Sequence, residues 1–456
     1  MLLKTRLYGK IYQFNDVKDL LAKANEEKSG DSLAGIAARS EQERVAAKIV
    51  LAHALVSDLR EAPAVPYEQD EVTRLIQDHV DESVYARIRG WSLAELREFI
   101  LDTATPPAAL TELSRGLTAE VIAAVTKLMS NMDLVVAAQK LRVTATCNTT
   151  IGGDGVFAAR LQPNHPADSI EGIRASLYEG LAYGAGDAVI GLNPVVDSVA
   201  GITRILSLFD EVKRRWEIPT QICVLAHITT QLAAIRAGAP TDLIFQSIAG
   251  SEKGNEAFGF TAEHVREALA LLRERGTGRG PDVLYFETGQ GSELSSGAHH
   301  GADQLTMEAR CYGFAKPFHP FLVNTVVGFI GPEYLYDARQ VIRAGLEDHF
   351  MGKLTGLPMG CDACYTNHMR ADQNDLENLA MLLVSAGCSY VMGLPHGDDI
   401  MLNYQSTGYH DAHTLRLLYG KTAIPEFQDW LVRMELIAPD GRPAERFGDA
   451  SVFLEG

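Results

Sequence analysis

The chain has 456 residues, of which 46% are hydrophobic and 22% are charged. These proportions exclude a disordered chain and a small disulfide-stapled scaffold, and they allow a large buried core. There are 59 acidic and 41 basic side chains, which give a formal net charge of −18. Phosphate binding needs clustered Lys and Arg, so this balance disfavours a nucleic-acid partner.

The cysteines and the apolar runs indicate the compartment. The six cysteines are few for this length and several lie in apolar runs, which favours buried thiols in a reducing compartment over disulfides. No apolar segment follows the basic residues near Met1, so we see no secretory signal. The longest uncharged stretch, 378–397, is broken by Ser, Gly and Pro, which argues against a membrane span. We therefore expect a cytoplasmic chain with no membrane partner.

The first part of the chain has helical patterning. Ser40 with Glu43, and Ser92 with Glu95, have the spacing of capping boxes, and each pair precedes apolar residues at helical intervals. No strand-like alternation is visible over 1–130. The sequence therefore predicts an N-terminal helical region over these residues.

The pattern changes near residue 142, where short β-rich runs begin to alternate with longer helical segments. The runs are nearly continuous in apolar character, as is typical of parallel strands buried on both faces. The predicted strands are 143–148, 188–193, 222–228, 243–248, 283–288, 322–329, 357–362 and 389–394. Eight strand–helix units in about 260 residues match a TIM barrel in count and length.

We predict an α/β protein with a (β/α)8 TIM barrel over 131–415, an N-terminal helical extension and a C-terminal helical tail over 416–456. Asp168 and Pro332 are expected to mark the starts of two connecting helices. The main alternative is a doubly wound open sheet, but no glycine-rich dinucleotide fingerprint follows the first predicted strand.

Polar residues end or interrupt the apolar runs where a TIM barrel carries its active site, at the C-terminal ends of the strands. The groups are Asn193, Gln246, Glu287 and Asp362, together with Arg160 and Gln162 in the loop expected after the first strand. A single polar residue at a strand end is ordinary. Several such groups that converge on one end of a barrel favour a functional site.

These residue types describe a particular pocket. Glu287 and Asp362 can pair with a small ammonium group, because an unpaired buried carboxylate is costly. Asn193 and Gln162 add oriented hydrogen-bonding groups, and Arg160 can hold an oxygen that develops negative charge. The interpretation is a polar pocket that suits a small cationic substrate.

Other groups carry weaker signals. Cys361 and Cys364 have CxxC spacing, but no second pair or histidine follows at zinc-site spacing, so we interpret them as structural thiols. His410 and His413 are interpreted as solvated or capping side chains, and no metal is expected. A metal- or carboxylate-dependent TIM-barrel hydrolase and a non-catalytic assembly subunit stay open as alternatives.

Long strings of residues then identify a family. They include NTTIG from Asn148, FAARLQPN from Phe157, GDAVIGLNPV from Gly186, LYFETGQGSELSSGA from Leu284 and MGCDACYTNH from Met359. Such strings run through essentially the whole chain, which resembles the large (heavy, α) subunit of ethanolamine ammonia-lyase. The resemblance implies a TIM barrel with an N-terminal helical extension, in agreement with the strand count.

The resemblance also implies a reaction and its partners. It implies a radical lyase that converts ethanolamine to acetaldehyde and ammonia with adenosylcobalamin (coenzyme B12), bound at the barrel mouth. A separate small subunit shares this cofactor site, in an assembly of six large and six small subunits. The family often works inside a bacterial microcompartment, so this location is expected too.

The resemblance assigns roles to individual positions. The family's substrate contacts fall on Arg160, Gln162, Asn193, Glu287 and Asp362, with Glu287, Arg160 and Asp362 as the catalytic groups. Its cobalamin contacts fall on Pro194, Gln246, Ser295 and Met401. The substrate set coincides with strand-end groups that position alone had singled out.

Overall fold

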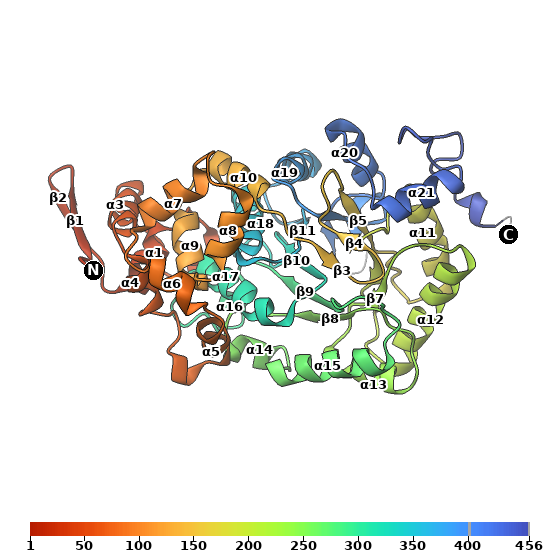
Figure 1. Ribbon diagram of the computed structural model, residues 1–456, viewed down its shortest axis with the longest axis horizontal. Coiled ribbons are helices and arrows are strands. Elements are labelled where there is room, and N and C mark those ends of the chain that lie inside the picture. Colours follow the sequence, from red (N-terminus) through yellow and green to blue (C-terminus); the bar gives the residue numbers. More distant parts are fainter. Residues whose placement is uncertain (400–402, 455–456) are drawn as a thin grey trace.

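The structure is a computed structural model that describes residues 1–399 and 403–454. Eight parallel strands form one sheet in the order β7-β6-β5-β13-β11-β10-β9-β8, which follows the chain around a barrel (Figure 1). Leu243 N donates to Ile222 O at 3.2 Å and links the two ends of the sheet. The strands are β5 (Ala158–Leu161), β6 (Val189–Leu192), β7 (Ile222–Val224), β8 (Ile244–Ser247), β9 (Leu284–Thr288), β10 (Leu322–Val326), β11 (Met359–Asp362) and β13 (Tyr390–Gly393). The predicted (β/α)8 TIM barrel is confirmed.

Each barrel strand leads into a helix on the outside of the barrel. These helices are α11 (Ile170–Ala182), α12 (Val199–Arg215), α13 (Ile228–Arg236), α15 (Ala262–Arg275), α17 (Gln304–Ala315), α18 (Ala338–Thr355), α19 (Gln373–Ser385) and α20 (Asp411–Tyr419). Two short helices, α14 (Glu252–Ala257) and α16 (Ser292–Ser295), lie in the loops after β8 and β9. Several of these helices begin at a side chain that accepts a hydrogen bond from an N–H of the first turn, as at Ser198, Asp303 and Asp372.

The first barrel strand differs from the prediction. Within 143–148 only β3 (Ala145–Thr146) is extended, and it pairs with β4 (Thr150–Ile151) in a separate two-stranded sheet. The first barrel strand is β5, between β13 and β6. Its sequence, AARL, carries a charged residue inside the barrel and so lacks the apolar run of the other strands. Arg160 therefore lies within a strand, and Gln162 directly follows it, rather than both lying in a later loop.

Two predicted helix starts are also wrong. Ser169, not Asp168, caps α11 by accepting from Gly172 N, while Asp168 has φ 48° and accepts the N–H groups of the loop after β6. Asp337 caps α18, so this helix begins beyond Pro332. In both cases an Asp or Ser side chain nearer to the first helical turn satisfies its N–H groups.

The N-terminal region begins with a hairpin that the sequence analysis missed. β1 (Lys4–Leu7) pairs with β2 (Lys10–Gln13) around Tyr8 and Gly9, which have φ of 48° and 78° as in a two-residue hairpin turn. The helices that follow are α1 (Val17–Ala24), α2 (Ser29–Leu33), α3 (Glu41–Ala52), α4 (Val56–Arg60), α5 (Glu71–Asp78), α6 (Glu82–Ile88), α7 (Leu93–Leu101), α8 (Pro107–Ser114), α9 (Ala119–Lys127) and α10 (Asn131–Lys140). The expected helical character of this region is thus confirmed outside the hairpin.

The N-terminal helices pack on one side of the barrel, against α17 and α18 (Figure 1). Every residue of α17 is buried, because the barrel covers one face and helices such as α9 cover the other. Buried ion pairs cross this boundary: Lys28 lies 2.7 Å from Glu347, and Lys127 lies 2.9 Å from Asp303. The helical extension and the barrel therefore share one interior.

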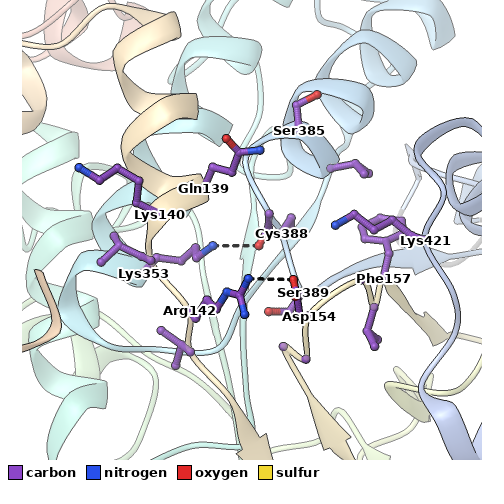
Figure 2. A pocket seen from close by; sticks show the side chains of 18 residues that line it. Gln139, Lys140, Arg142, Asp154, Phe157, Lys353, Ser385, Cys388, Ser389 and Lys421 are labelled. Carbon is purple, nitrogen blue, oxygen red and sulfur yellow. Dashed lines mark hydrogen bonds and ion pairs between the residues drawn. The ribbon is translucent and has the colours of Figure 1, made fainter. Parts of the chain in front are cut away.

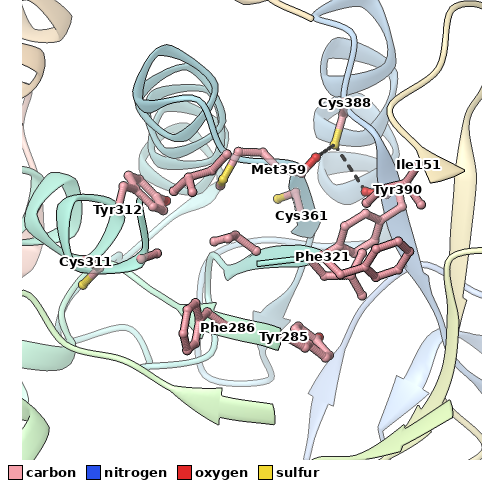
Figure 3. Packing of buried hydrophobic residues seen from close by; sticks show 14 of the residues in the cluster. Ile151, Tyr285, Phe286, Cys311, Tyr312, Phe321, Met359, Cys361, Cys388 and Tyr390 are labelled. Carbon is pink, nitrogen blue, oxygen red and sulfur yellow. Dashed lines mark hydrogen bonds between the residues drawn. The ribbon is translucent and has the colours of Figure 1, made fainter. Parts of the chain in front are cut away.

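The core continues into the barrel wall. Figure 3 shows Tyr285 and Phe286 of β9 in the same cluster as Tyr312 of α17 and Cys361 of β11. All six cysteines are buried and form no disulfide, including Cys361 and Cys364, which confirms the prediction of buried thiols.

A small antiparallel sheet follows the C-terminal ends of two barrel strands. It consists of β12 (Tyr365–Thr366), β15 (Tyr404–Gln405) and β14 (Asp398–Asp399), in that order, and we call it the mouth sheet. α21 (Pro425–Arg433) lies near the C-terminus. Within the described residues, no helix combines the length and apolar character that a membrane crossing needs.

Candidate active site

Arg160 lies at the centre of the barrel. It stands in register between Val189 of β6 and Met392 of β13, and its side chain is fully buried. Its Nη1 lies 2.9 Å from Met392 Sδ, and its guanidinium carbon lies 5.4 Å from the centre of the Tyr285 ring. Its Nε and Nη2 have no hydrogen-bond partner among the described residues. Because unpaired buried donors are costly, these groups call for an acceptor from a bound molecule.

Glu287 lies on β9, in register with Asn324 of β10. Its Oε2 accepts hydrogen bonds from the Tyr285 hydroxyl at 3.1 Å and from Asn324 Nδ2 at 3.2 Å. Burial raises the pKa of Glu287, while the charge of Arg160 and these two hydrogen bonds oppose the rise. A carboxyl group with a raised pKa is suited to accept and return a proton.

Asp362 is the last residue of β11 and is almost fully buried. Its Oδ2 accepts from the Tyr404 hydroxyl at 2.9 Å, and its Oδ1 accepts from the Ser406 hydroxyl. Burial raises the pKa of Asp362 to about 7, against the effect of these two hydroxyl donors. The group therefore changes charge near neutral pH unless a cation binds beside it.

Two amide side chains present unpaired oxygens. Gln162 donates from Nε2 to Asp399 Oδ2 at 2.8 Å, which leaves its buried Oε1 without a partner among the described residues. Asn193 directly follows β6, and its N–H donates to Asn164 Oδ1 at 3.1 Å. Its own Oδ1 is buried and has no partner in the described part of the chain. The site thus lacks a donor for two oxygens and an acceptor for Arg160.

The structure brings the predicted substrate contacts together. The charges of Glu287 and Arg160 both influence the pKa of Asp362, and Asp399 influences that of Glu287. Asp399 in turn contacts Gln162, so the carboxylates, the arginine and the amide belong to one buried polar cluster. This cluster lies at the C-terminal ends of the strands, as predicted.

The four predicted cobalamin contacts differ from one another in burial and in hydrogen bonding. Gln246 lies in β8 with its amide engaged by the main chain, because Oε1 accepts from Ile228 N at 3.1 Å and Nε2 donates to Ser247 O at 2.8 Å. Pro194 is half-buried in the loop after β6, and Ser295 is exposed at the end of α16. Met401 lies outside the described residues.

Exposed apolar side chains lie in two loops at the same end of the barrel. Val195 and Val196 in the loop after β6 are 45% and 61% exposed, and Phe329 after β10 is 37% exposed. We call these three side chains the apolar rim. Exposed apolar groups beside a polar pocket are typical of a ligand-binding surface.

Sequence reasoning missed several residues of the cluster. Asn324 interrupts an apolar strand in the same way as Gln246, so that signal was available. Tyr404, Ser406 and Asp399 belong to or adjoin the mouth sheet, whose two-residue strands have no periodicity to detect. Their role follows only from the fold.

A cavity of about 370 Å³ lies at the opposite end of the barrel, beside the residues that precede β5 and β13 (Figure 2). Three of the four cations that line it have partners in the chain, and one of them, Lys140, donates to Ile100 O at 2.8 Å. Lys353 donates to Gly387 O at 2.9 Å and Arg142 pairs with Asp154 at 3.0 Å. Lys353 thereby neutralises the C-terminus of α19. The predicted site residues do not line this cavity, and no group of three or more metal-ligating side chains occurs among residues 1–399 and 403–454.

The fold and the buried polar cluster define a TIM-barrel enzyme with its site at the C-terminal end of the strands. The family model for the ethanolamine ammonia lyase large subunit (EutB) matches residues 12–446. The chain is 58% identical to the ethanolamine ammonia-lyase large subunit of Salmonella typhimurium strain LT2 and 57% identical to that of Escherichia coli K12, over 454 residues and 100% of each chain. The chain therefore belongs to the ethanolamine ammonia-lyase large-subunit family, as the resemblance indicated.

The crystal structure of HydG, a maturase of the FeFe hydrogenase, matches with a TM-score of 0.42 and 11% identity, over 83% of this chain and 86% of the other.

Proposed function

We propose that this chain is the catalytic subunit of an adenosylcobalamin-dependent lyase that converts ethanolamine to acetaldehyde and ammonia. One observation carries the proposal: the hydrogen-bonding groups left unpaired in the site complement 2-aminoethanol. The unpaired N–H groups of Arg160 match the hydroxyl oxygen, while the free oxygens of Gln162 and Asn193 match an ammonium. The names of the relatives support the substrate.

The ammonium is assigned to Glu287, Asp362, Asn193 and Gln162. Two carboxylates next to one cation replace the hydration that burial removes, and the cation favours their charged forms. The hydroxyl is assigned to Arg160, with Glu287 or Gln162 beside it. In this arrangement the unpaired groups of Arg160, Gln162 and Asn193 gain partners, and the two carboxylates lie beside a cation.

Adenosylcobalamin fits the mouth of the barrel. The apolar rim offers a surface for its ring, and Pro194, Gln246, Ser295 and Met401 are the proposed contacts. When bound, it supplies the carbon radical that removes a hydrogen atom from the carbinol carbon of the substrate. Cobalamin enzymes that use a protein histidine as lower ligand carry a D-x-H-x-x-G motif, which this sequence lacks: 348–352 has the wrong spacing, and His349 is fully buried in α18. We therefore propose that no histidine of this chain would act as a ligand of the cofactor.

The side chains of the barrel perform the remaining tasks. Arg160 stabilises negative charge on the substrate oxygen while the nitrogen leaves or migrates. Glu287 takes and returns a proton. Met392 lies against Arg160, and Phe329 lies edge-on to Tyr404 with 5.6 Å between ring centres, so both exclude water from the reacting carbons.

The proposal includes a partner. A small subunit completes the cofactor site, in an assembly of six large and six small subunits, and the complex works in a bacterial microcompartment. This partner chain covers the apolar rim together with the cofactor.

The test is acetaldehyde production from ethanolamine by this chain, co-expressed with a candidate small subunit and assayed in dim light with and without adenosylcobalamin. Turnover that depends on the cofactor is the expected result. An assembled, cobalamin-loaded complex without turnover would contradict the proposed reaction and fit a non-catalytic assembly subunit. Activity without cobalamin that chelators abolish would favour a metal-dependent hydrolase.

A further inference from the structure

Asp399 holds two amide side chains in one orientation. It lies in β14 of the mouth sheet and is fully buried, and its Oδ2 accepts from Gln162 Nε2 and from Asn164 Nδ2, each at 2.8 Å. A primary amide fits a pocket in two orientations that exchange its oxygen and nitrogen. Because Oδ2 of Asp399 accepts both of these hydrogen bonds, both amides turn their NH2 groups toward Asp399.

The fixed orientation determines what the pocket offers a ligand. With its NH2 group on Asp399, Gln162 has only Oε1 left, and this buried oxygen has no partner among the described residues. Asn164 is turned in the same way, so its Oδ1 accepts from the N–H of Asn193 at 3.1 Å. The Asp399 carboxylate thus fixes the orientation of the Gln162 oxygen. Through Asn164 it also holds the main chain of Asn193, whose side chain carries a second unpaired oxygen.

We infer that Asp399 is a positioning residue for the substrate ammonium, because it presents the oxygen rather than the NH2 group of Gln162 to the pocket. This inference rests on the proposed function, in which Gln162 accepts a hydrogen bond from the ammonium. Asp399 pairs in register with Tyr404, whose hydroxyl holds Asp362. The mouth sheet therefore fixes two separate groups that face the ammonium.

A second role for Asp399 makes a different prediction. Its negative charge acts on Glu287 and contributes to the raised pKa of that carboxyl. An effect of charge alone would not depend on Gln162. An effect through orientation requires the Gln162 amide, so the two roles separate in a double-mutant cycle.

The experiment measures ethanolamine binding by calorimetry, with KM and kcat, in the assembled and cobalamin-loaded complex. Asn at position 399 can donate as well as accept, so Gln162 loses its fixed orientation and can turn its NH2 group toward the ammonium. Asp399→Asn is expected to weaken binding and to raise KM by roughly 10- to 100-fold, as for a lost hydrogen bond to a charged group, with a smaller change in kcat. Asp398→Asn is the matched control in the same strand, because Asp398 accepts from Gln405 instead, and it is expected to leave binding unchanged.

Gln162→Ala completes the cycle. Alone it should weaken binding to a similar extent, and in its background Asp399→Asn should add less than about a twofold change. Unchanged binding in Asp399→Asn or in Gln162→Ala would overturn the inference, and so would fully additive effects. Failure of the wild-type complex to bind ethanolamine would instead contradict the proposed function.

Discussion

The hydroxyl of Tyr404 donates a hydrogen bond of 2.9 Å to Oδ2 of Asp362. Asp362 ends a barrel strand, whereas Tyr404 belongs to the mouth sheet, so this contact joins two parts of the chain at the site. A donor stabilises the charged form of a carboxyl group, and burial opposes it. The pKa of Asp362, about 7, is the balance of these effects and makes the site sensitive to pH.

Substrate affinity should therefore depend on pH through Asp362. The carboxyl is neutral below about pH 7, so the affinity for the ammonium is expected to fall as pH decreases through that value. Tyr404→Phe removes a donor to the charged form and should move this acidic limb to higher pH. The pH profile of kcat/KM checks both expectations, and a limb that stays in place in Tyr404→Phe would contradict this role of the hydroxyl.

The pH dependence that Asp362 gives to the free energy of unfolding has the opposite sign. Since the pKa of Asp362 is raised in the folded chain, its contribution to the free energy of unfolding is fully present at low pH. It is lost as pH rises from about 4, the ordinary value for Asp, to about 7. Asp362→Asn without substrate should remove this pH-dependent part, which thermal unfolding across that range would measure.

Glu287→Gln tests the proton-handling group. The variant keeps the size and hydrogen bonds of the side chain but cannot take up a proton, so turnover should fall by roughly 100- to 10,000-fold. Cobalamin binding, followed by visible absorption, should stay near normal. Glu171→Gln on the exposed side of α11 is a matched control with unchanged turnover. Retained turnover in Glu287→Gln would refute the assignment.

Arg160→Ala tests electrostatic stabilisation of the substrate oxygen. Removal of such a donor is expected to raise the barrier by about 2–4 kcal/mol. Because the side chain is fully buried, its loss leaves a space that guanidinium can enter, and added guanidinium should restore part of kcat. Full activity of the variant without guanidinium would be incompatible with this role.

Lys28→Met tests the attachment of the N-terminal helices. Burial alone would raise the pKa of Glu347, but Lys28 and Arg343 hold it at about 2. Loss of one partner of a buried pair should lower the free energy of unfolding by about 3 kcal/mol, seen as a lower urea midpoint. The stabilisation by Glu347 is present above about pH 4.5 and lost as pH falls toward 2, so the variant should depend less on pH in this range. Exposed Lys4→Met is the control, and an equal midpoint shift there would contradict the account.

Much of the barrel follows from sequence, because buried parallel strands leave uninterrupted apolar runs. The exception is β5, which carries Arg160 into the interior. Because this charged residue interrupts the apolar run, the sequence pattern does not identify the strand that holds the centre of the site. The run at 143–148 has the right composition but pairs only with β4. A functional residue here breaks the local pattern that identifies its own strand.

The candidate site likewise contains residues that the sequence identifies and residues that only the fold reveals. Glu287 and Asp362 stand at ends of recognisable strands, so their convergence follows once a barrel is assumed. Asp399 and Tyr404 reach the site from a segment far along the chain from Gln162, and only tertiary contacts place them there. The groups that bind are thus visible in the sequence, whereas the groups that orient them are not.

The most direct test of the central claim follows the hydrogen atom. The assembled complex with adenosylcobalamin is supplied with ethanolamine that carries two deuterium atoms on the carbinol carbon, in ordinary water. The account predicts acetaldehyde with deuterium in both the aldehyde and the methyl group, because the abstracted atom returns to the neighbouring carbon. A methyl group without deuterium, whose third hydrogen comes from water, would indicate ionic elimination and would contradict the radical mechanism.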